Sequence, residues 1–219
     1  KYSTAGDGTC ADIDAGKQGQ LLASGSVYAA TGAKFQVLCV AGKFELNGNA
    51  DCKDVPAGHV GRVANDADAF ANQVGALYAK PCSAGYFRVA AAVGTTADCL
   101  DIADGKQGQL LGTGSEYVAT GAEFAVDCAK GKFEPNGDAA CSNVAAGKVG
   151  RISDAPTHNL IDSVHEVGAA FEVECANGTY RAANNDASNC ITVPDGQQGE
   201  NGAGAYASTG AVAAVDCIA

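Results

Sequence analysis

Short segments of the chain alternate between hydrophobic and polar residues. Phe35, Val37 and Cys39 would lie on one face of a strand, and the polar side chains of Lys34 and Gln36 would lie on the other. The same spacing of Phe, Val and Cys recurs at two further places, residues 124–128 and 171–175. Alternation over so few residues predicts short, half-buried β-strands and indicates an all-β fold.

An aromatic residue follows four of the cysteines at the fifth position, after a short loop that contains glycine. These aromatic residues are Phe44, Phe87, Phe133 and Tyr180. A strand, a glycine loop and a second apolar segment are typical of a β-hairpin, so we expect each aromatic residue to pair with the strand before it. The Asn-Gly dipeptides at residues 47–48 and 136–137 tolerate positive φ and predict the turn that follows.

The chain contains an internal duplication. When residues 10–52 are laid over residues 99–141, about 28 of 43 positions are identical without a gap. Weaker copies lie between and after them, and a fifth copy begins at Cys190 but lacks its second half. We therefore expect tandem, sandwich-like β-modules bordered by cysteines, at residues 11–52, 53–99, 100–141 and 142–190, with an incomplete module at 191–219.

Residues 1–10 match the second half of a module. They align without a gap on residues 43–52, with Tyr2 in place of Phe44 and Cys10 in place of Cys52. We expect this segment to be a donor strand without a partner in its own chain, and the module at 191–219 to be its acceptor. An unpaired strand edge invites another chain. Because this contact is head to tail and does not close on itself, it predicts a fibre.

Ten cysteines in an acidic, Gly-rich chain indicate a disulfide framework formed in an oxidising compartment. We therefore expect a secreted protein, either extracellular or on the cell surface. The net charge of −11 and the scattered basic residues argue against nucleic-acid binding. No run of about 18 apolar residues is present, so we expect no insertion into a membrane.

Two disulfide schemes fit the spacing. In the first, each hairpin is closed locally, through Cys39–Cys52, Cys82–Cys99, Cys128–Cys141 and Cys175–Cys190. Cys10 and Cys217 then remain, and Cys217 of one subunit would bond to Cys10 of the next. In the second, each module is closed across its longer arm, through Cys10–Cys39, Cys52–Cys82, Cys99–Cys128, Cys141–Cys175 and Cys190–Cys217. We favour the first because it bridges adjacent strands of compatible length, whereas loop entropy is about 3 kcal/mol per bond in both.

The sequence offers no recognisable catalytic centre. The histidines, His59, His158 and His165, lack metal-ligand spacing, and neither a nucleophile elbow nor a phosphate-binding loop is present. Each histidine is expected to be an ordinary loop or surface residue. The recurring Gly-Lys-Gln-Gly-Gln segment, at residues 16–20 and 105–109, is expected to form a tight bend. We therefore expect no enzymatic activity, no metal and no cofactor.

Glycans are the one expected modification. Asn177-Gly178-Thr179 is an N-glycosylation motif in a predicted hairpin loop. Repeated Thr-Gly-Ala segments make three threonines candidates for O-glycosylation, although we favour a turn before the next strand as their explanation: Thr31, Thr120 and Thr209.

These features together predict a structural subunit of an extracellular fibre whose partner is a second copy of itself. The alternative is a secreted carbohydrate-binding or cell-adhesion repeat protein with surface glycans as partners. Repetition, secretion and the periodic Tyr28, Tyr117 and Tyr206 favour the alternative. The lack of Trp, the strongest platform for stacking on sugars, argues against it.

Overall fold

The structure is a computed structural model that describes residues 1–4, 8–24, 27–65, 71–112, 116–152, 164–182 and 188–217. Short strands, turns and loops make up these residues, together with one 3-10 helix, η1 (Ala90–Ala92). The all-β prediction is therefore confirmed. Among the described residues, no helix has the length and apolar character needed to cross a membrane.

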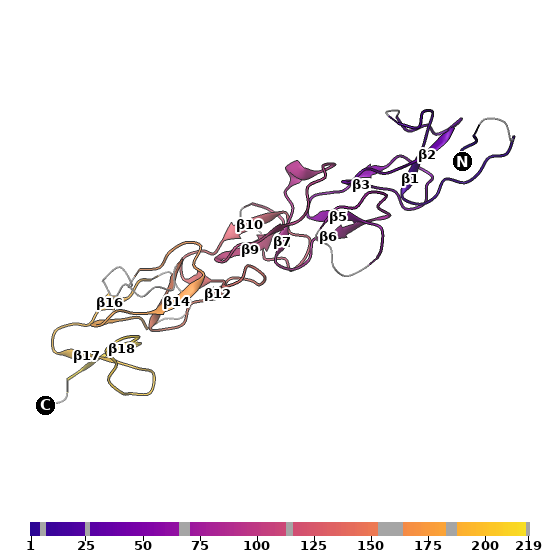
Figure 1. Cartoon of the computed structure of the whole chain (residues 1–219). Helices are drawn as coiled ribbons and strands as arrows, with labels where there is room; N and C mark the ends of the chain where they lie inside the picture. Colours follow the sequence, from indigo (N-terminus) through magenta and orange to yellow (C-terminus); the bar gives the residue numbers. More distant parts are fainter. Residues whose placement is uncertain are drawn as a thin grey trace. The chain divides into compact units, whose positions relative to one another are not determined.

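The described strands form nine two-stranded sheets of two kinds. Long pairs have four residues per strand: β1 (Lys17–Gln20) with β2 (Phe35–Leu38), β5 (His59–Arg62) with β6 (Tyr78–Pro81), β9 (Lys106–Gln109) with β10 (Phe124–Asp127), β13 (Lys148–Arg151) with β14 (Phe171–Glu174), and β17 (Gln197–Glu200) with β18 (Ala213–Asp216). Short pairs have two residues per strand: β3 (Lys43–Phe44) with β4 (Lys53–Asp54), β7 (Tyr86–Phe87) with β8 (Leu100–Asp101), β11 (Lys132–Phe133) with β12 (Ser142–Asn143), and β15 (Thr179–Tyr180) with β16 (Ile191–Thr192). Figure 1 labels most of these strands; within each unit, the labelled strands follow one another in chain order.

The chain divides into two compact units, and the division falls within the β9–β10 sheet. One unit contains residues 1–101 and 109–124, and the other contains residues 102–108 and 125–219. The predicted module boundaries at residues 52, 99, 141 and 190 stay predictions.

The predicted hairpins are wrong in their pairing. β2 does not pair with the aromatic strand that follows it; it pairs antiparallel with β1, with Val37 opposite Gln18. The aromatic strand β3 pairs instead with β4, with Phe44 opposite Lys53. Every sheet whose register is described is likewise antiparallel.

The pairing differs because the Gly-Lys-Gln-Gly-Gln segment is mostly a strand and not a bend. Only its first residue, Gly16, has a positive φ, of 75°. Gly19 lies within β1, where a Cβ would be 2.8 Å from Ile13 Cδ1 and 2.9 Å from Ala33 Cβ. This glycine is therefore needed for close packing and not for a turn.

Four disulfides join the long pairs to the short pairs, and they are those of the first scheme: Cys39–Cys52, Cys82–Cys99, Cys128–Cys141 and Cys175–Cys190. Their Cα–Cα distances of 5.6 to 5.9 Å are ordinary for disulfides. In each bond, the first cysteine follows the long pair and the second precedes the last strand of the short pair. Cys10 and Cys217 are free thiols, and both are exposed.

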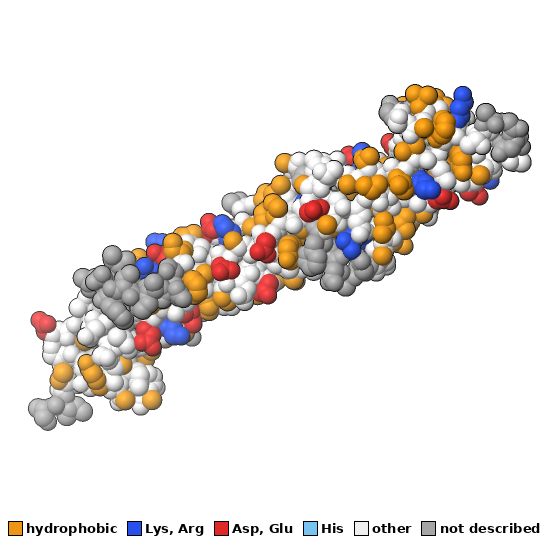
Figure 2. Space-filling model, viewed as in Figure 1, with side chains coloured by type: hydrophobic (Ala, Val, Ile, Leu, Met, Phe, Trp, Pro, Cys, Tyr) orange, Lys and Arg blue, Asp and Glu red, His pale blue; other side chains and the backbone are white. Residues whose placement is uncertain are grey.

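The apolar cores are small and are built around these disulfides. In the first unit, Val60 packs with Cys82 and Cys99 against Tyr86. In the second unit, Val149 packs with Cys175 and Cys190. Many larger apolar side chains stay on the surface, where hydrophobic groups are scattered over the face shown in Figure 2. Burial of apolar area is thus limited, and the fold relies strongly on its disulfides and backbone hydrogen bonds.

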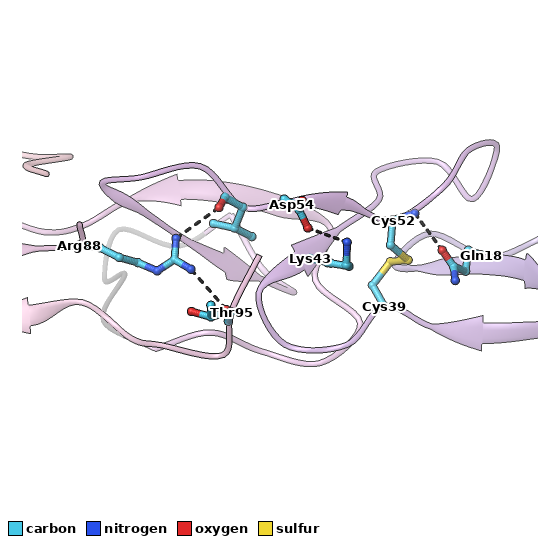
Figure 3. A network of polar contacts seen from close by, with 8 residues as sticks. Gln18, Cys39, Lys43, Cys52, Asp54, Arg88 and Thr95 are labelled. Atoms are coloured by element: carbon cyan, nitrogen blue, oxygen red, sulfur yellow. Dashed lines mark hydrogen bonds and ion pairs between the residues drawn. A yellow bond between two sulfur atoms is a disulfide. The ribbon is translucent and has the colours of Figure 1, made fainter. Parts of the chain in front are cut away.

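Each unit contains a buried arginine directly after the aromatic residue of a short pair. Arg88 is 1% exposed, and its guanidinium donates to the carbonyls of Pro56 (2.9 Å), Ala97 (2.9 Å) and Thr95 (3.3 Å). Figure 3 shows the contact with Thr95. Burial lowers the pKa of this guanidinium, and the charge of Asp98 partly opposes that shift. The hydrogen bonds of Arg88 join the long loop between β7 and β8 to the backbone before β5.

Arg181 makes the same kind of network in the second unit. It is 2% exposed and donates to the carbonyls of Ser188 (2.9 Å), Ala145 (2.9 Å) and Lys148 (3.2 Å). Because the same kind of contacts occurs in both units, the buried arginine is a repeated feature of the fold.

Replacement of Arg88 by Met should destabilise the protein by about 3 kcal/mol, because several buried carbonyls lose their donors while the apolar volume is kept. Urea denaturation under non-reducing conditions measures this change. Arg88→Lys should recover only part of the loss, because an ammonium cannot reproduce the planar guanidinium fork. A urea midpoint for Arg88→Met equal to that of the unchanged protein would contradict this role.

Candidate assembly interface

A backbone hydrogen bond fixes each of the first four long pairs to the short pair that follows it. The N–H of the glycine before the long pair donates to the carbonyl of the residue after the aromatic residue of the short pair. These bonds are Gly16 to Glu45 (2.7 Å), Gly58 to Arg88 (2.8 Å), Gly105 to Glu134 (2.7 Å) and Gly147 to Arg181 (2.8 Å). This hydrogen bond and the disulfide together attach each short pair to its long pair at two points.

A second set of backbone bonds joins one repeat to the next. The carbonyl of the cysteine after each long pair accepts from a glycine N–H of the following repeat: Cys39 from Gly75 (2.7 Å), Cys82 from Gly121 (2.8 Å), Cys128 from Gly168 (2.8 Å) and Cys175 from Gly210 (3.0 Å). Each of these contacts lies within one of the two units. Successive repeats are thus held by backbone groups, which no side-chain substitution can replace.

The glycine before each long pair also leaves no room for a side chain. A Cβ on Gly16 would lie 2.2 Å from the Gly75 carbonyl oxygen, and one on Gly147 would lie 2.3 Å from that of Gly210. The values for Gly58 and Gly105 are 2.1 and 2.0 Å. All four have a positive φ. Both close approach and backbone conformation therefore require glycine here.

The long pair β17–β18 is a complete hairpin, so the prediction that its last strand lacks a partner is wrong. Ala213 pairs with Glu200 and Asp216 pairs with Gln197. What is missing in the described residues is a short pair after it. Within those residues, neither the Gly196 N–H nor the Cys217 carbonyl takes part in a hydrogen bond.

Residues around β17 are exposed where their counterparts are covered. A Cβ on Gly196 would meet nothing within 4 Å, in contrast to the four glycines above. Gln198 is exposed, whereas its counterpart Gln18 is partly buried and accepts the Cys52 N–H at 3.0 Å (Figure 3). Gln107 accepts the Cys141 N–H in the same way, at 2.9 Å.

Tyr206 is also more exposed than its counterpart Tyr28. Tyr206 is 64% exposed, whereas Tyr28 is partly buried and its hydroxyl donates to the Asn49 carbonyl at 3.2 Å. A cavity of about 450 Å³ lies beside Tyr206, with Gly178, Gly196 and Gln198 also in its lining. The space that a short pair occupies elsewhere is therefore open here.

Residues 1–11 contain a short pair, and this corrects the donor-strand prediction for Tyr2. The Tyr2 N–H donates to the Ala11 carbonyl at 2.8 Å, and the Ala11 N–H donates back at 2.9 Å. The Ser3 N–H donates to the Ala33 carbonyl at 3.0 Å, as the Glu45 N–H does to Ala76. Tyr2 is thus paired within its own chain, because Ala11 directly follows Cys10 as Lys53 follows Cys52. Residues 5–7 of the predicted strand lie outside the described residues.

The other side of this N-terminal short pair is open. A Cβ on Gly8, which aligns with Ala50, would meet nothing within 4 Å. A Cβ on Gly32 would also meet nothing within 4 Å. Within the described residues, the Ser3 carbonyl and the Gly32 N–H form no hydrogen bond. The groups left open on residues 1–11 and 32 are the complements of those left open around β17–β18.

The histidines do not form a site. His59 Nδ1 lies 2.8 Å from the Ala57 carbonyl oxygen, and His158 lies outside the described residues. His165 lies in a loop, as expected, but it is buried rather than solvated: it is 1% exposed, and its Nδ1 accepts the Gly150 N–H at 2.9 Å. Asn72 takes the equivalent place in the first unit by accepting the Gly61 N–H. In the described part of the chain, no group of three or more His, Cys, Asp or Glu residues could hold a metal ion.

The predicted glycosylation residues lie in exposed turns. Asn177 is exposed, while the Thr179 hydroxyl of the same motif is buried and donates to the Ala176 carbonyl at 2.7 Å. The three threonine candidates, Thr31, Thr120 and Thr209, are exposed, and Thr209 donates to a Glu174 carboxylate oxygen at 2.8 Å. Their glycosylation stays a prediction.

Comparison with known proteins adds no relative. No protein-family model matches the chain, and no curated protein matches it either.

Replacement of Gly147 by Ala should destabilise the second unit by at least about 3 kcal/mol, since backbone strain at positive φ adds to a clash with the Gly210 carbonyl. Gly204→Ala is the matched control: Gly204 has a φ of 81°, but its Cβ would be 3.9 Å from the nearest atom, Glu200 Oε1. That control should lose only about 1 kcal/mol. Thermal unfolding compares the two variants, and equal losses would show that the close approach is not needed.

Proposed function

We propose that the protein is a structural subunit of an extracellular fibre built from tandem β-modules. In this fibre, residues 1–11 of one copy supply the short pair that follows β17–β18 of the next copy. The observation that carries the proposal is the match between the two open surfaces. Each backbone group left open at residues 196 and 217 has its missing counterpart at residues 3 and 32.

The contacts inside the chain define the geometry of the proposed junction. By the pattern of the four internal repeats, Gly196 would donate to the Ser3 carbonyl of the neighbouring copy. The neighbouring Gly32 would donate to the Cys217 carbonyl. Cys217 would bond to Cys10 of the neighbour, as Cys39 bonds to Cys52. The donated element is a paired segment with its own cysteine, and not the single strand that the sequence predicted.

The two half-repeats are also of the same type. Repeats with glutamine at the second position of the long pair, at Gln18 and Gln107, have a short pair whose cysteine lies eight positions after its aromatic residue. The half-repeat at β17–β18 has Gln198 at this position, and Cys10 likewise lies eight positions after Tyr2. The Gln198 side chain is thus suited to accept the N–H of the neighbouring Cys10.

The proposed contact is heterologous, so each added copy presents a new open half-repeat and growth continues. Four internal disulfides support an oxidising, extracellular setting in which a fifth bond between copies would persist. A mechanical role follows, because each junction would combine a covalent bond with backbone hydrogen bonds.

Sedimentation of the full chain tests the proposal. The unchanged protein should sediment as a polymer, and Gly196→Ala should remain monomeric, since its Cβ would meet the Gly32 carbonyl of the neighbour at about 2 Å, as at the internal sites. Gly204→Ala should polymerise like the unchanged protein. A monomer that binds members of a glycan array would instead support the carbohydrate-binding alternative, and a polymerising Gly196→Ala variant would refute the junction.

A mixture of two cysteine variants tests the covalent part. Cys10→Ser keeps only the free thiol of Cys217, and Cys217→Ser keeps only that of Cys10. When the two variants are mixed under mild oxidation, we expect one species of covalent dimer and no longer chain on a non-reducing denaturing gel. Each variant alone should remain uncrosslinked. Equal crosslinking of a variant with itself would show that the thiols react without docking.

A further inference from the structure

The proposed junction changes the exposure of the two free thiols. Cys10 and Cys217 are exposed in the single chain. The cysteines at the place of Cys217 in the complete repeats are at most 1% exposed: Cys39, Cys82, Cys128 and Cys175. Those at the place of Cys10 are 4 to 9% exposed: Cys52, Cys99, Cys141 and Cys190. Docking of one copy on another would therefore bury both sulfur atoms.

This burial limits how the bond can be made. Joining two thiols removes two electrons and two protons, and a disulfide oxidant must bring its own sulfur into line with the attacking thiolate. In a docked pair, neither thiolate has that access. Oxidation of the docked thiols would need the junction to open again, so the oxidising step must come before docking.

We propose that Cys10 or Cys217 first forms a mixed disulfide with a small thiol compound, and that docking completes the bond by exchange; this inference rests on the proposed fibre. In the first step, a protein thiolate attacks a small symmetrical disulfide, RS–SR, and releases RS⁻. In the second step, the thiolate of the neighbouring copy attacks the protein sulfur of the mixed disulfide. The Cys10–Cys217 bond forms, and the second RS⁻ leaves. The small disulfide is the only oxidant: it accepts the two electrons that the two protein thiolates lose when their one bond forms.

The mixed disulfide would thus be the activated form of the subunit. The small R group leaves one face of the exposed cysteine free, and the backbone contacts of Gly196 and Ser3 would hold the attacking thiolate beside it. Proximity of this kind raises the local concentration of the thiol well above its concentration in solution. Assembly would then release one small thiol for each junction formed.

The experiment uses the full-length cysteine variants. Cys10→Ser is capped at Cys217 with a chromophoric aromatic thiol and mixed with reduced Cys217→Ser; the reverse pair, capped at Cys10, is treated alike. We expect one equivalent of released chromophore for each covalent dimer, at equal rates. Reduced variants that are mixed first and given the chromophoric disulfide afterwards should crosslink at least about tenfold more slowly, because their thiols are shielded. Equal rates in the two orders of addition would overturn this inference.

A second variant separates this inference from the fibre itself. In Cys10→Ser that also carries Gly196→Ala, chromophore release should fall to the rate measured with a free small thiol at the same concentration. If the reduced variants show no complex by sedimentation and Gly196→Ala has no effect on release, the proposed function fails as well. If a complex forms but the order of addition has no effect, only the exchange mechanism fails.

Discussion

Close contact between backbone groups of successive repeats is the constraint on which the rest of this structure depends. The chain buries few large apolar side chains, and its two core clusters each consist of a valine beside a disulfide. Glycine N–H groups and cysteine carbonyls provide the contacts that side chains provide in larger cores. Such contacts need backbones in van der Waals contact, which explains why a Cβ on Gly16 would lie 2.2 Å from the next repeat. The high glycine content of the chain and its close backbone packing therefore follow from the same requirement.

A fold held by backbone groups leaves a specific surface wherever a neighbour is missing. An incomplete apolar core would expose a general hydrophobic patch, which many partners could cover. Within the described residues, the repeat at β17–β18 instead exposes single donors and acceptors at fixed positions, the Gly196 N–H and the Cys217 carbonyl. Only a segment with the matching groups at the same spacing satisfies them. This is the physical basis for inferring a second copy of the chain as the partner.

The strands that begin at Phe35, Phe124 and Phe171 could be predicted from the sequence, since they show alternation and end in cysteine. The strand Lys17–Gln20 could not, because its Lys, Gln and Gly residues show no alternation of apolar and polar side chains and glycine has low strand propensity. Missing this strand led to the wrong partner for β2. The burial of Arg88, Arg181 and His165 was also hidden, because such residues in loops are usually solvated. The first disulfide scheme already left Cys10 and Cys217 without a partner in their own chain. The pairing of Tyr2 with Ala11 could not be predicted, because each side contributes only one residue to it.

The two kinds of short pair bear on which segment β17–β18 would select in the proposed junction. In one kind, the residue after the aromatic is Glu45 or Glu134, and its carboxylate accepts an N–H only two residues ahead. In the other kind, it is Arg88 or Arg181, which reaches carbonyls of a longer loop. A long pair with glutamine at its second position faces the compact kind, because that side chain must accept the N–H of a nearby cysteine. Residues 1–11 are compact and carry no such arginine, so a half-repeat marked by Gln198 would select them over the segments built around Arg88 and Arg181.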